Sequence, residues 1–118
     1  MIKVSSRRFE NRIEWYKEGT DILHREDGPA IEWNHGTKHW YQNGKLYRKD
    51  GPVIETDKLK AYYQAYGLNG EAGYHREDGP AIEKNDGTKV YYYRGMPYEN
   101  ISSDEEWINF ICILKIID

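Results

Sequence analysis

Three short segments of this chain place side chains that can move protons next to one another. Each has a histidine or tyrosine, then an arginine, and then an aspartate: His24-Arg25-Glu26-Asp27, Tyr47-Arg48-Lys49-Asp50 and His75-Arg76-Glu77-Asp78. A histidine beside a carboxylate is suited to general acid–base catalysis. However, the middle copy carries Tyr47 instead of histidine, and an enzyme rarely needs the same group three times. We therefore predict that these residues are structural and that the chain is not an enzyme.

No other set of residues predicts a metal or cofactor site. His35 and His39 lie four residues apart, but a turn is predicted between them, so they would not share one face of a helix. Cys112 is the single cysteine, and no base that would activate its thiol stands beside it. The glycines belong to Asn-Gly and Asp-Gly turns rather than to a phosphate-binding loop. We expect neither a cofactor nor a metal.

The three segments are part of a longer repeat. Asp-Gly-Pro occurs three times, and a small apolar residue, an isoleucine and a glutamate follow each copy: Ala30-Ile31-Glu32, Val53-Ile54-Glu55 and Ala81-Ile82-Glu83. Internal repeats at this spacing indicate an array of supersecondary units. In such an array we expect the repeated arginine to pair with the repeated glutamate of a neighbouring unit.

Turn signals divide each unit into short strands. His35-Gly36 separates residues 31–33 from residues 38–41, and Asn43-Gly44 separates the second strand from residues 45–48. Asn-Gly between strand-like residues is a strong signal for a tight hairpin. The sequence therefore predicts a mainly β fold, an elongated single-layer antiparallel sheet of tandem β-hairpin repeats with a C-terminal α-helical cap.

We expect one domain in three parts. Residues 1–12 form an N-terminal edge strand or arm, residues 13–100 form about four hairpin repeats, and residues 101–118 form the capping helix. Ser102 and Ser103 each precede a glutamate by three residues, which is the pattern of a capping box.

The expected helix has more apolar surface than the end of one sheet would cover. Trp107 begins a stripe of apolar residues at helical spacing, and Ile113 and Ile116 widen it. Two interpretations remain open. The helix packs across the last hairpins, or these three residues form part of a dimer or partner surface.

Alternation along the strands assigns side chains to two faces. Ile31, Ile54 and Ile82 share one face with Trp33, and the repeated glutamates share the other. In the middle strands, one stripe of rings is Trp40, Tyr62 and Tyr91, and the opposite stripe is Tyr41, Tyr63 and Tyr92. Rings on both faces are expected of a curled sheet with neither face fully dry.

The repeat resembles the tandem "DGPA" repeats that are related to MORN repeats and occur in bacteriophage and bacterial proteins. The resemblance spans about residues 13 to 100 and is carried by His/Tyr-Arg-x-Asp-Gly-Pro and Gly-Thr-Lys-x-Trp/Tyr-Tyr. It implies stacked antiparallel hairpins with a shallow groove. MORN-type proteins serve mostly as platforms for protein interaction, and one bacterial branch is described as antitoxin or immunity proteins.

We therefore expect a small inhibitor that binds a bacterial host protein or a toxin, of the anti-defence or the immunity type. The expected partner-binding residues are rings and two arginines: Trp33, Trp40, Tyr62, Tyr63, Tyr66, Tyr91, Tyr92, Arg48 and Arg76. Tyr66 belongs to an irregular insertion, Tyr66-Gly67-Leu68, and irregular loops often carry recognition.

Two alternatives stay open. Nucleic acid or a nucleotide could stack on the arginine–tyrosine ladder, although the repeated aspartates and glutamates count against it. The chain could instead be a structural module that forms a homodimer through its C-terminal helix.

Bulk properties set the remaining expectations. The 118 residues carry a net charge of −3, without the basic excess typical of nucleic-acid-binding domains. No apolar segment is long enough to cross a bilayer, and no signal peptide follows Met1. We expect a cytoplasmic protein that does not bind membranes, located in the host cytoplasm if a phage encodes it.

Overall fold

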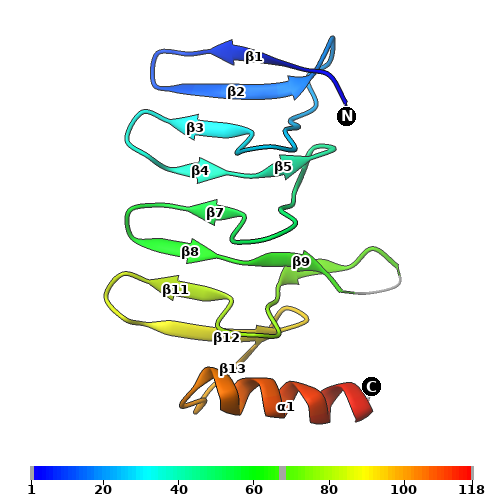
Figure 1. The fold of residues 1–118 in the computed structure, drawn as a ribbon, viewed down its shortest axis with the longest axis vertical. Coiled ribbons are helices and arrows are strands. Elements are labelled where there is room, and N and C mark those ends of the chain that lie inside the picture. The colour runs from blue at the N-terminus through cyan, green and yellow to red at the C-terminus, as the bar shows by residue number, and fades with distance from the viewer. Residues whose placement is uncertain (1, 67–68, 118) are drawn as a thin grey trace. The chain divides into compact units, whose positions relative to one another are not determined.

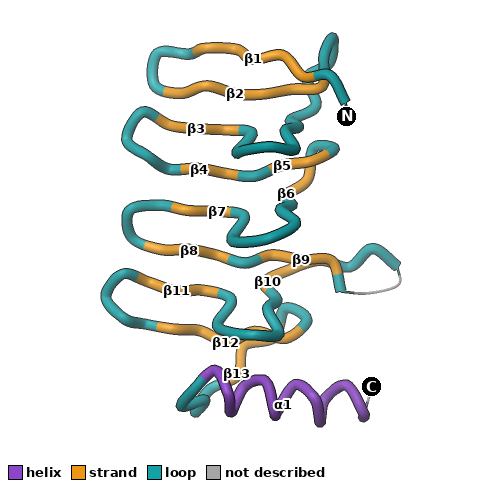
Figure 2. Tube along the Cα trace, viewed as in Figure 1, coloured by secondary structure: helices purple, strands orange, loops and turns teal. Residues whose placement is uncertain are grey.

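The chain is mainly β, with one helix near its C-terminus (Figure 1). A computed structural model describes residues 2–66 and 69–117. These residues form antiparallel strands that are two to six residues long, connected by tight turns and corners (Figure 2). The chain divides into two compact units, unit 1 (Met1–Leu59) and unit 2 (Lys60–Asp118), which are described separately.

Unit 1 is an antiparallel sheet in the order β1 (Val4–Arg8), β2 (Arg12–Lys17), β3 (Ile31–Trp33), β4 (Lys38–His39) and β7 (Ile54–Glu55). A short ribbon of β5 (Tyr41–Gln42) and β6 (Lys45–Leu46) extends from it. His39 of β4 lies opposite Ile31 on one side and Ile54 on the other, so the three share one face, as the alternation predicted for the two isoleucines.

Unit 2 repeats the plan. After β8 (Leu59–Ala61), which begins at the last residue of unit 1, the sheet continues with β11 (Ile82–Lys84), β12 (Lys89–Tyr93) and β13 (Met96–Tyr98). The ribbon of this unit pairs β9 (Tyr63–Ala65) with β10 (Ala72–Tyr74). Of the expected insertion, Tyr66 is described, whereas Gly67 and Leu68 lie outside the described residues.

The ribbon turns have the backbone that the sequence predicted. Asn43 and Gly44 both have positive φ, 53° and 77°, which a type I′ hairpin turn requires. The last hairpin has the same geometry at Arg94 and Gly95, with φ of 51° and 77°. Because arginine has no special preference for positive φ, other contacts must hold this turn, and one of them comes from a buried histidine described below.

The helix α1 (Asp104–Ile117) begins where the capping box predicted. Ser103 Oγ accepts the Glu106 N–H at 3.1 Å, and the Glu106 carboxylate accepts the Ser102 N–H at 3.3 Å. The helix buries Trp107 and Ile111 against Tyr91 and Tyr93. The predicted fold class, mainly antiparallel β with a C-terminal helix, is therefore confirmed.

The described part of the chain contains no helix that is both long and apolar enough to cross a membrane.

Candidate binding surfaces

A repeated arginine lies flat on an aromatic ring in both units. The distance from the guanidinium carbon to the ring centroid is 4.3 Å for Arg25 on Trp15, 3.8 Å for Arg48 on Trp40 and 3.9 Å for Arg76 on Tyr62. Cation–π contacts of this kind contribute roughly 0.5–2 kcal/mol, more as they are withdrawn from water. We call the side of the sheet that carries these contacts the ladder face.

Nη1 of each of these guanidinium groups also donates two hydrogen bonds within the sheet. Nη1 of Arg48 donates to the Pro52 carbonyl at 3.0 Å and to the Glu55 carboxylate at 2.9 Å. Arg25 and Arg76 repeat both bonds, with Glu32 at 3.0 Å and Glu83 at 2.7 Å. The predicted pairing of repeated arginine with repeated glutamate is confirmed. Each arginine therefore connects an aromatic ring, the Asp-Gly-Pro corner and the strand that follows the corner.

The glycine of Asp-Gly-Pro has a steric role that the sequence did not reveal. A Cβ atom at Gly28, Gly51 or Gly79 would lie only 2.8, 2.8 or 2.9 Å from the guanidinium carbon of the arginine three residues earlier. Gly51 also has a φ of 127°, which side chains rarely adopt. Each corner therefore needs glycine so that the arginine can cross it and reach the glutamate.

His24 and His75, the two histidines that stand beside carboxylates in the sequence, are buried. Both nitrogens of each ring have a hydrogen-bond partner. Nδ1 of His24 accepts the Asn43 N–H at 2.9 Å, and its Nε2 lies 3.1 Å from the Glu26 carboxylate. His75 makes the same pair of contacts, with the Arg94 N–H at 2.9 Å and with Glu77 at 3.2 Å. Each histidine thereby holds the positive-φ residue of a ribbon turn. This arrangement leaves neither ring a free nitrogen for proton transfer.

The helix ends the ladder by replacing the arginine with a tryptophan. The Trp107 ring lies 5.2 Å from that of Tyr91, and its indole N–H donates to the Arg76 carbonyl at 2.8 Å. The Tyr91 hydroxyl donates to Asp104 at 2.8 Å. Burial, together with this hydrogen bond, raises the pKa of Tyr91 to about 12. Trp107 is 0% exposed, so the expectation that it belongs to a dimer surface is wrong.

The opposite side of each sheet, which we call the open face, carries a row of rings in mutual contact. In unit 1 the row is Trp33, His39 and Tyr41, with centroids 4.8 and 6.4 Å apart. In unit 2 it is Tyr63, Tyr74 and Tyr92, with centroids 5.9 and 5.3 Å apart. Tyr74 is exposed and the other five are half-buried. Burial lowers the pKa of His39, which favours its neutral form in this row.

The tyrosines of the open face keep their hydroxyls unused. Tyr41, Tyr63, Tyr74 and Tyr92 have no hydrogen-bond partner for the hydroxyl among residues 2–66 and 69–117. On the ladder face, by contrast, the Tyr91 hydroxyl donates a hydrogen bond to Asp104. The open face therefore presents rigid rings whose polar ends remain available to a partner.

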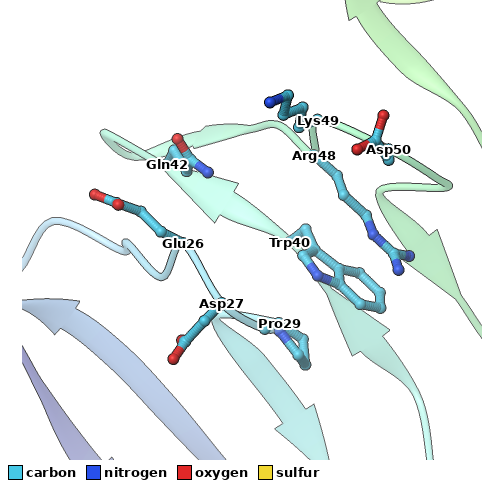
Figure 3. Close-up of a pocket in the computed structure, with 9 residues that line it drawn as sticks. Glu26, Asp27, Pro29, Trp40, Gln42, Arg48, Lys49 and Asp50 are labelled. Atoms are coloured by element: carbon cyan, nitrogen blue, oxygen red, sulfur yellow. The ribbon is translucent and has the colours of Figure 1, made fainter. Parts of the chain in front are cut away.

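A groove of about 520 Å³ lies in unit 1 on the ladder face (Figure 3). Trp40 and Arg48 lie next to each other in its lining, with Glu26 and Asp27 on one side and Lys49 and Asp50 on the other (Figure 3). Asp27 and Asp78 form ion pairs with Arg25 and Arg76, whereas Asp50 has none within the described residues. The groove combines polar and apolar groups, and of its charged side chains Arg48 bonds the corner carbonyl of Pro52 and Asp27 pairs with Arg25.

Among the described residues, no three histidine, cysteine, aspartate or glutamate side chains come together as metal ligands. The chain was also compared with known proteins. No family model, curated protein or solved structure matched it. The candidate surfaces therefore stand on their own geometry.

The structure separates the predicted partner-binding residues into two groups. Trp40 and Tyr91 are buried, whereas Tyr62, Arg48 and Arg76 are half-buried and take part in the ladder. Trp33, Tyr63 and Tyr92 lie on the open face, and Tyr66 contacts His75 in unit 2.

Sequence reasoning missed His39 and Tyr74 as members of the open-face rows. The signal was present for His39, because it lies two residues from Tyr41 in the same strand direction and therefore on the same face. Tyr74 could not be placed, because its pairing with Tyr63 depends on the length of the insertion between β9 and β10.

The outer side of α1 carries exposed isoleucines. Ile113 and Ile116, both predicted for an oligomer surface, are 55% and 85% exposed, and Ile108 and Ile117 accompany them at 42% and 75%.

Proposed function

We propose that this chain is a non-enzymatic protein-binding module that holds its partner on the open face. One observation carries the proposal, namely the rows of half-buried rings whose tyrosine hydroxyls have no partner in the described residues. Tyrosine and tryptophan are enriched among the residues that dominate binding energy at protein interfaces. Rings that already touch one another lose little side-chain entropy when a partner covers them.

The proposal for the kind of partner is based on the sequence alone. The likeness to tandem "DGPA" repeats of phage and bacterial proteins favours a small inhibitor of the anti-defence or immunity type, acting in the cytoplasm on a host protein or a toxin. The absence of a free nitrogen on His24 and His75 is compatible with binding rather than catalysis.

The test is capture of a stoichiometric partner by the tagged full-length chain and by matched variants. Tyr41→Ser together with Tyr74→Ser removes one ring from each row, and we expect capture to fall at least about tenfold, as for interface anchors. Tyr47→Ser is the control, because Tyr47 is also an exposed tyrosine, at 45%, but lies in neither row. Capture that survives the double substitution, or that is lost equally in the control, would contradict binding through the open face.

A homodimer is a second candidate, favoured by the exposed isoleucines of α1. Exposed apolar clusters often mark interfaces. Ile113→Asp with Ile116→Asp is expected to convert a dimer to a monomer in light scattering without unfolding it, since both side chains are more than half exposed. A wild-type chain that is monomeric at high concentration excludes this candidate.

Nucleic acid gains no support from the ladder. Each of the three repeated arginines is already stacked on a ring and bonded to a glutamate and a carbonyl. The contacts already made by Nη1 of each arginine leave fewer donors for a phosphate.

A further inference from the structure

The buried histidines occur at equivalent places in the two units, and this equivalence provides a reference. His24 and His75 each accept the N–H of the positive-φ residue in a ribbon turn and lie beside the glutamate two residues later. In unit 1 these contacts serve the turn. Anything found around His75 but not around His24 is therefore not needed to build the repeat.

Three side chains are added around His75. Tyr66, which belongs to the insertion, lies 5.5 Å from the His75 ring between centroids, and Tyr93 lies 5.2 Å from it on the repeat's own strand. The residue that corresponds to Tyr93 in unit 1 is Gln42, since each directly precedes the turn residue whose N–H binds the histidine. The third addition is Lys115 of α1, which forms an ion pair with Glu77.

Tyr66 packs against two glycines of unit 2. A Cβ atom at Gly95 would lie 3.2 Å from the Tyr66 hydroxyl, and one at Gly73 would lie 3.4 Å from it. Gly95 is needed for its turn, with a φ of 77°, but Gly73 has no positive φ and sits inside strand β10. Glycine weakens a strand interior and often marks the close approach of another group. A side chain at Gly73 would meet the Tyr66 ring at ordinary van der Waals distance, so the ring packs directly against this strand.

These additions enclose a pocket of about 290 Å³ within unit 2. Its walls are the rings of Tyr66, His75 and Tyr93, and its polar rim includes Gln64, Arg94 and Lys115. The volume is near the lower end for small-molecule sites. In unit 1 the position equivalent to Tyr93 holds Gln42, which has no ring.

The rim of the pocket is rich in hydrogen-bond donors. Lys115 carries a positive charge on a side chain that is 55% exposed and forms an ion pair with Glu77 through one of the three N–H groups of its ammonium. Partial burial alone would raise the pKa of Glu77, but the hydrogen bonds from Lys115 and His75 lower it on balance, so the carboxylate is ionised and already engaged. The Gln64 amide and the Tyr66 hydroxyl have no hydrogen-bond partner in the described part of the chain.

The geometry points to a site in unit 2 for a small anion that carries a flat ring, such as a nucleoside monophosphate or an aromatic carboxylate. The ring of the ligand stacks on Tyr66, which is half-buried and faces the pocket. The anionic group takes the donors of Lys115 and Gln64, because ionised groups make the strongest hydrogen bonds of this kind. The site is separate from the open face and does not depend on the proposed partner.

The test is an NMR titration of the full-length chain with four probes. Adenosine 5′-monophosphate and benzoate carry both a ring and a negative charge, whereas adenosine has only the ring and inorganic phosphate only the charge. We expect saturable shifts of the amides of His75, Arg94 and Lys115 with at least one of the first two. Adenosine and phosphate should bind about tenfold more weakly, since each lacks one of the two contacts. Four probes that leave these amides unmoved, or a ring-bearing anion that binds no better than its parts, overturn the proposal.

Two variants and a control assign the binding to the pocket. Lys115→Gln removes the charge at a side chain that is 55% exposed, so the fold should survive, and affinity should fall about tenfold. Tyr66→Ala should weaken every ring-bearing probe, whereas Tyr66→Phe keeps the stacking surface and should retain most of the affinity. Lys84→Gln is the matched control, because Lys84 is an exposed lysine of unit 2 outside the pocket. Equal loss in Lys115→Gln and Lys84→Gln would show that only the overall charge matters and would overturn the assignment.

Discussion

The ladder face and the open face carry similar side chains but use them differently. On the ladder face, Trp40 is stacked under Arg48, and Tyr91 is covered by Trp107, with its hydroxyl bonded to Asp104. On the open face, Tyr63 and Tyr92 each lie beside Tyr74 and have no hydrogen-bond partner for their hydroxyls among the described residues. One face therefore stabilises the array, and the other is free to meet a partner. Substitutions should separate the two by their effect on stability.

The largest expected effect is at the cap. Trp107→Ala removes a fully buried ring and the donor to the Arg76 carbonyl, so we expect unfolding to become easier by about 3–5 kcal/mol. Urea unfolding followed by circular dichroism measures this loss. Ile116→Ala, at an 85% exposed position of the same helix, should stay within about 0.5 kcal/mol of wild type. Equal effects would mean that Trp107 does not terminate the ladder as described.

The corner glycines allow the arginine contact to be separated from backbone strain. Gly51→Ala introduces both backbone strain and a steric clash, because the φ of Gly51 is 127° and the new Cβ would lie 2.8 Å from the guanidinium carbon of Arg48. Gly28→Ala suffers the contact with Arg25 without a positive φ, and Gly36→Ala suffers a φ of 105° with nothing within 4 Å. We expect losses of about 1–3 kcal/mol for each single cause and the largest loss for Gly51→Ala. Thermal unfolding of the three variants gives the order, and a Gly28→Ala chain as stable as wild type would remove the steric argument.

Alkaline pH should weaken unit 2 through Tyr91. Because its pKa is raised to about 12 in the folded chain, above the ordinary value of about 10, folding favours the protonated phenol. The contribution is complete below pH 10 and is lost as the pH rises towards 12. Tyr91→Phe cannot lose a proton, so its unfolding free energy should be lower at pH 8 by about 1 kcal/mol and fall less steeply between pH 10 and 12. Parallel pH profiles for the two chains would contradict this account.

The smallest effect on stability is expected on the open face. Tyr63→Phe with Tyr92→Phe removes two hydroxyls that have no partner in the described residues, and the free energy of unfolding should change by less than about 0.5 kcal/mol. The same double variant should bind the partner more weakly, because hydroxyls of interface tyrosines usually donate across the interface. A clear loss of stability would show that the open face is structural as well.

The local structure was predictable because its signals are local. Asn43-Gly44 determines its own turn, and Ser103 with Glu106 determines the start of the helix, since each signal acts within a few residues. The pairing of arginines with glutamates was also predictable, because a repeat brings equivalent residues to equivalent neighbours.

The assignment of faces was only half predictable. Alternation correctly placed Trp40 and Tyr41 on opposite sides of the strand, but it does not say which side the corner covers. That depends on how Asp-Gly-Pro carries Arg48 back over Trp40, which is a tertiary contact. The partnership of Trp107 with Tyr91 had no sequence signal, because tryptophan takes the place that arginine occupies elsewhere and shares none of its charge.

On Tyr91, the last ring of the ladder face, the Trp107 indole takes the place that an arginine guanidinium has on the other rings. This difference affects how such chains can change in length. The helix caps the last aromatic strand mainly by offering a ring and one N–H donor to a backbone carbonyl, and two side-chain contacts, Asp104 with Tyr91 and Lys115 with Glu77, add to this. A duplicated segment inserted ahead of the cap would bring its own arginine, glycine and glutamate and would present the same terminal ring. Repeat units can therefore be gained or lost while the capping helix α1 stays the same.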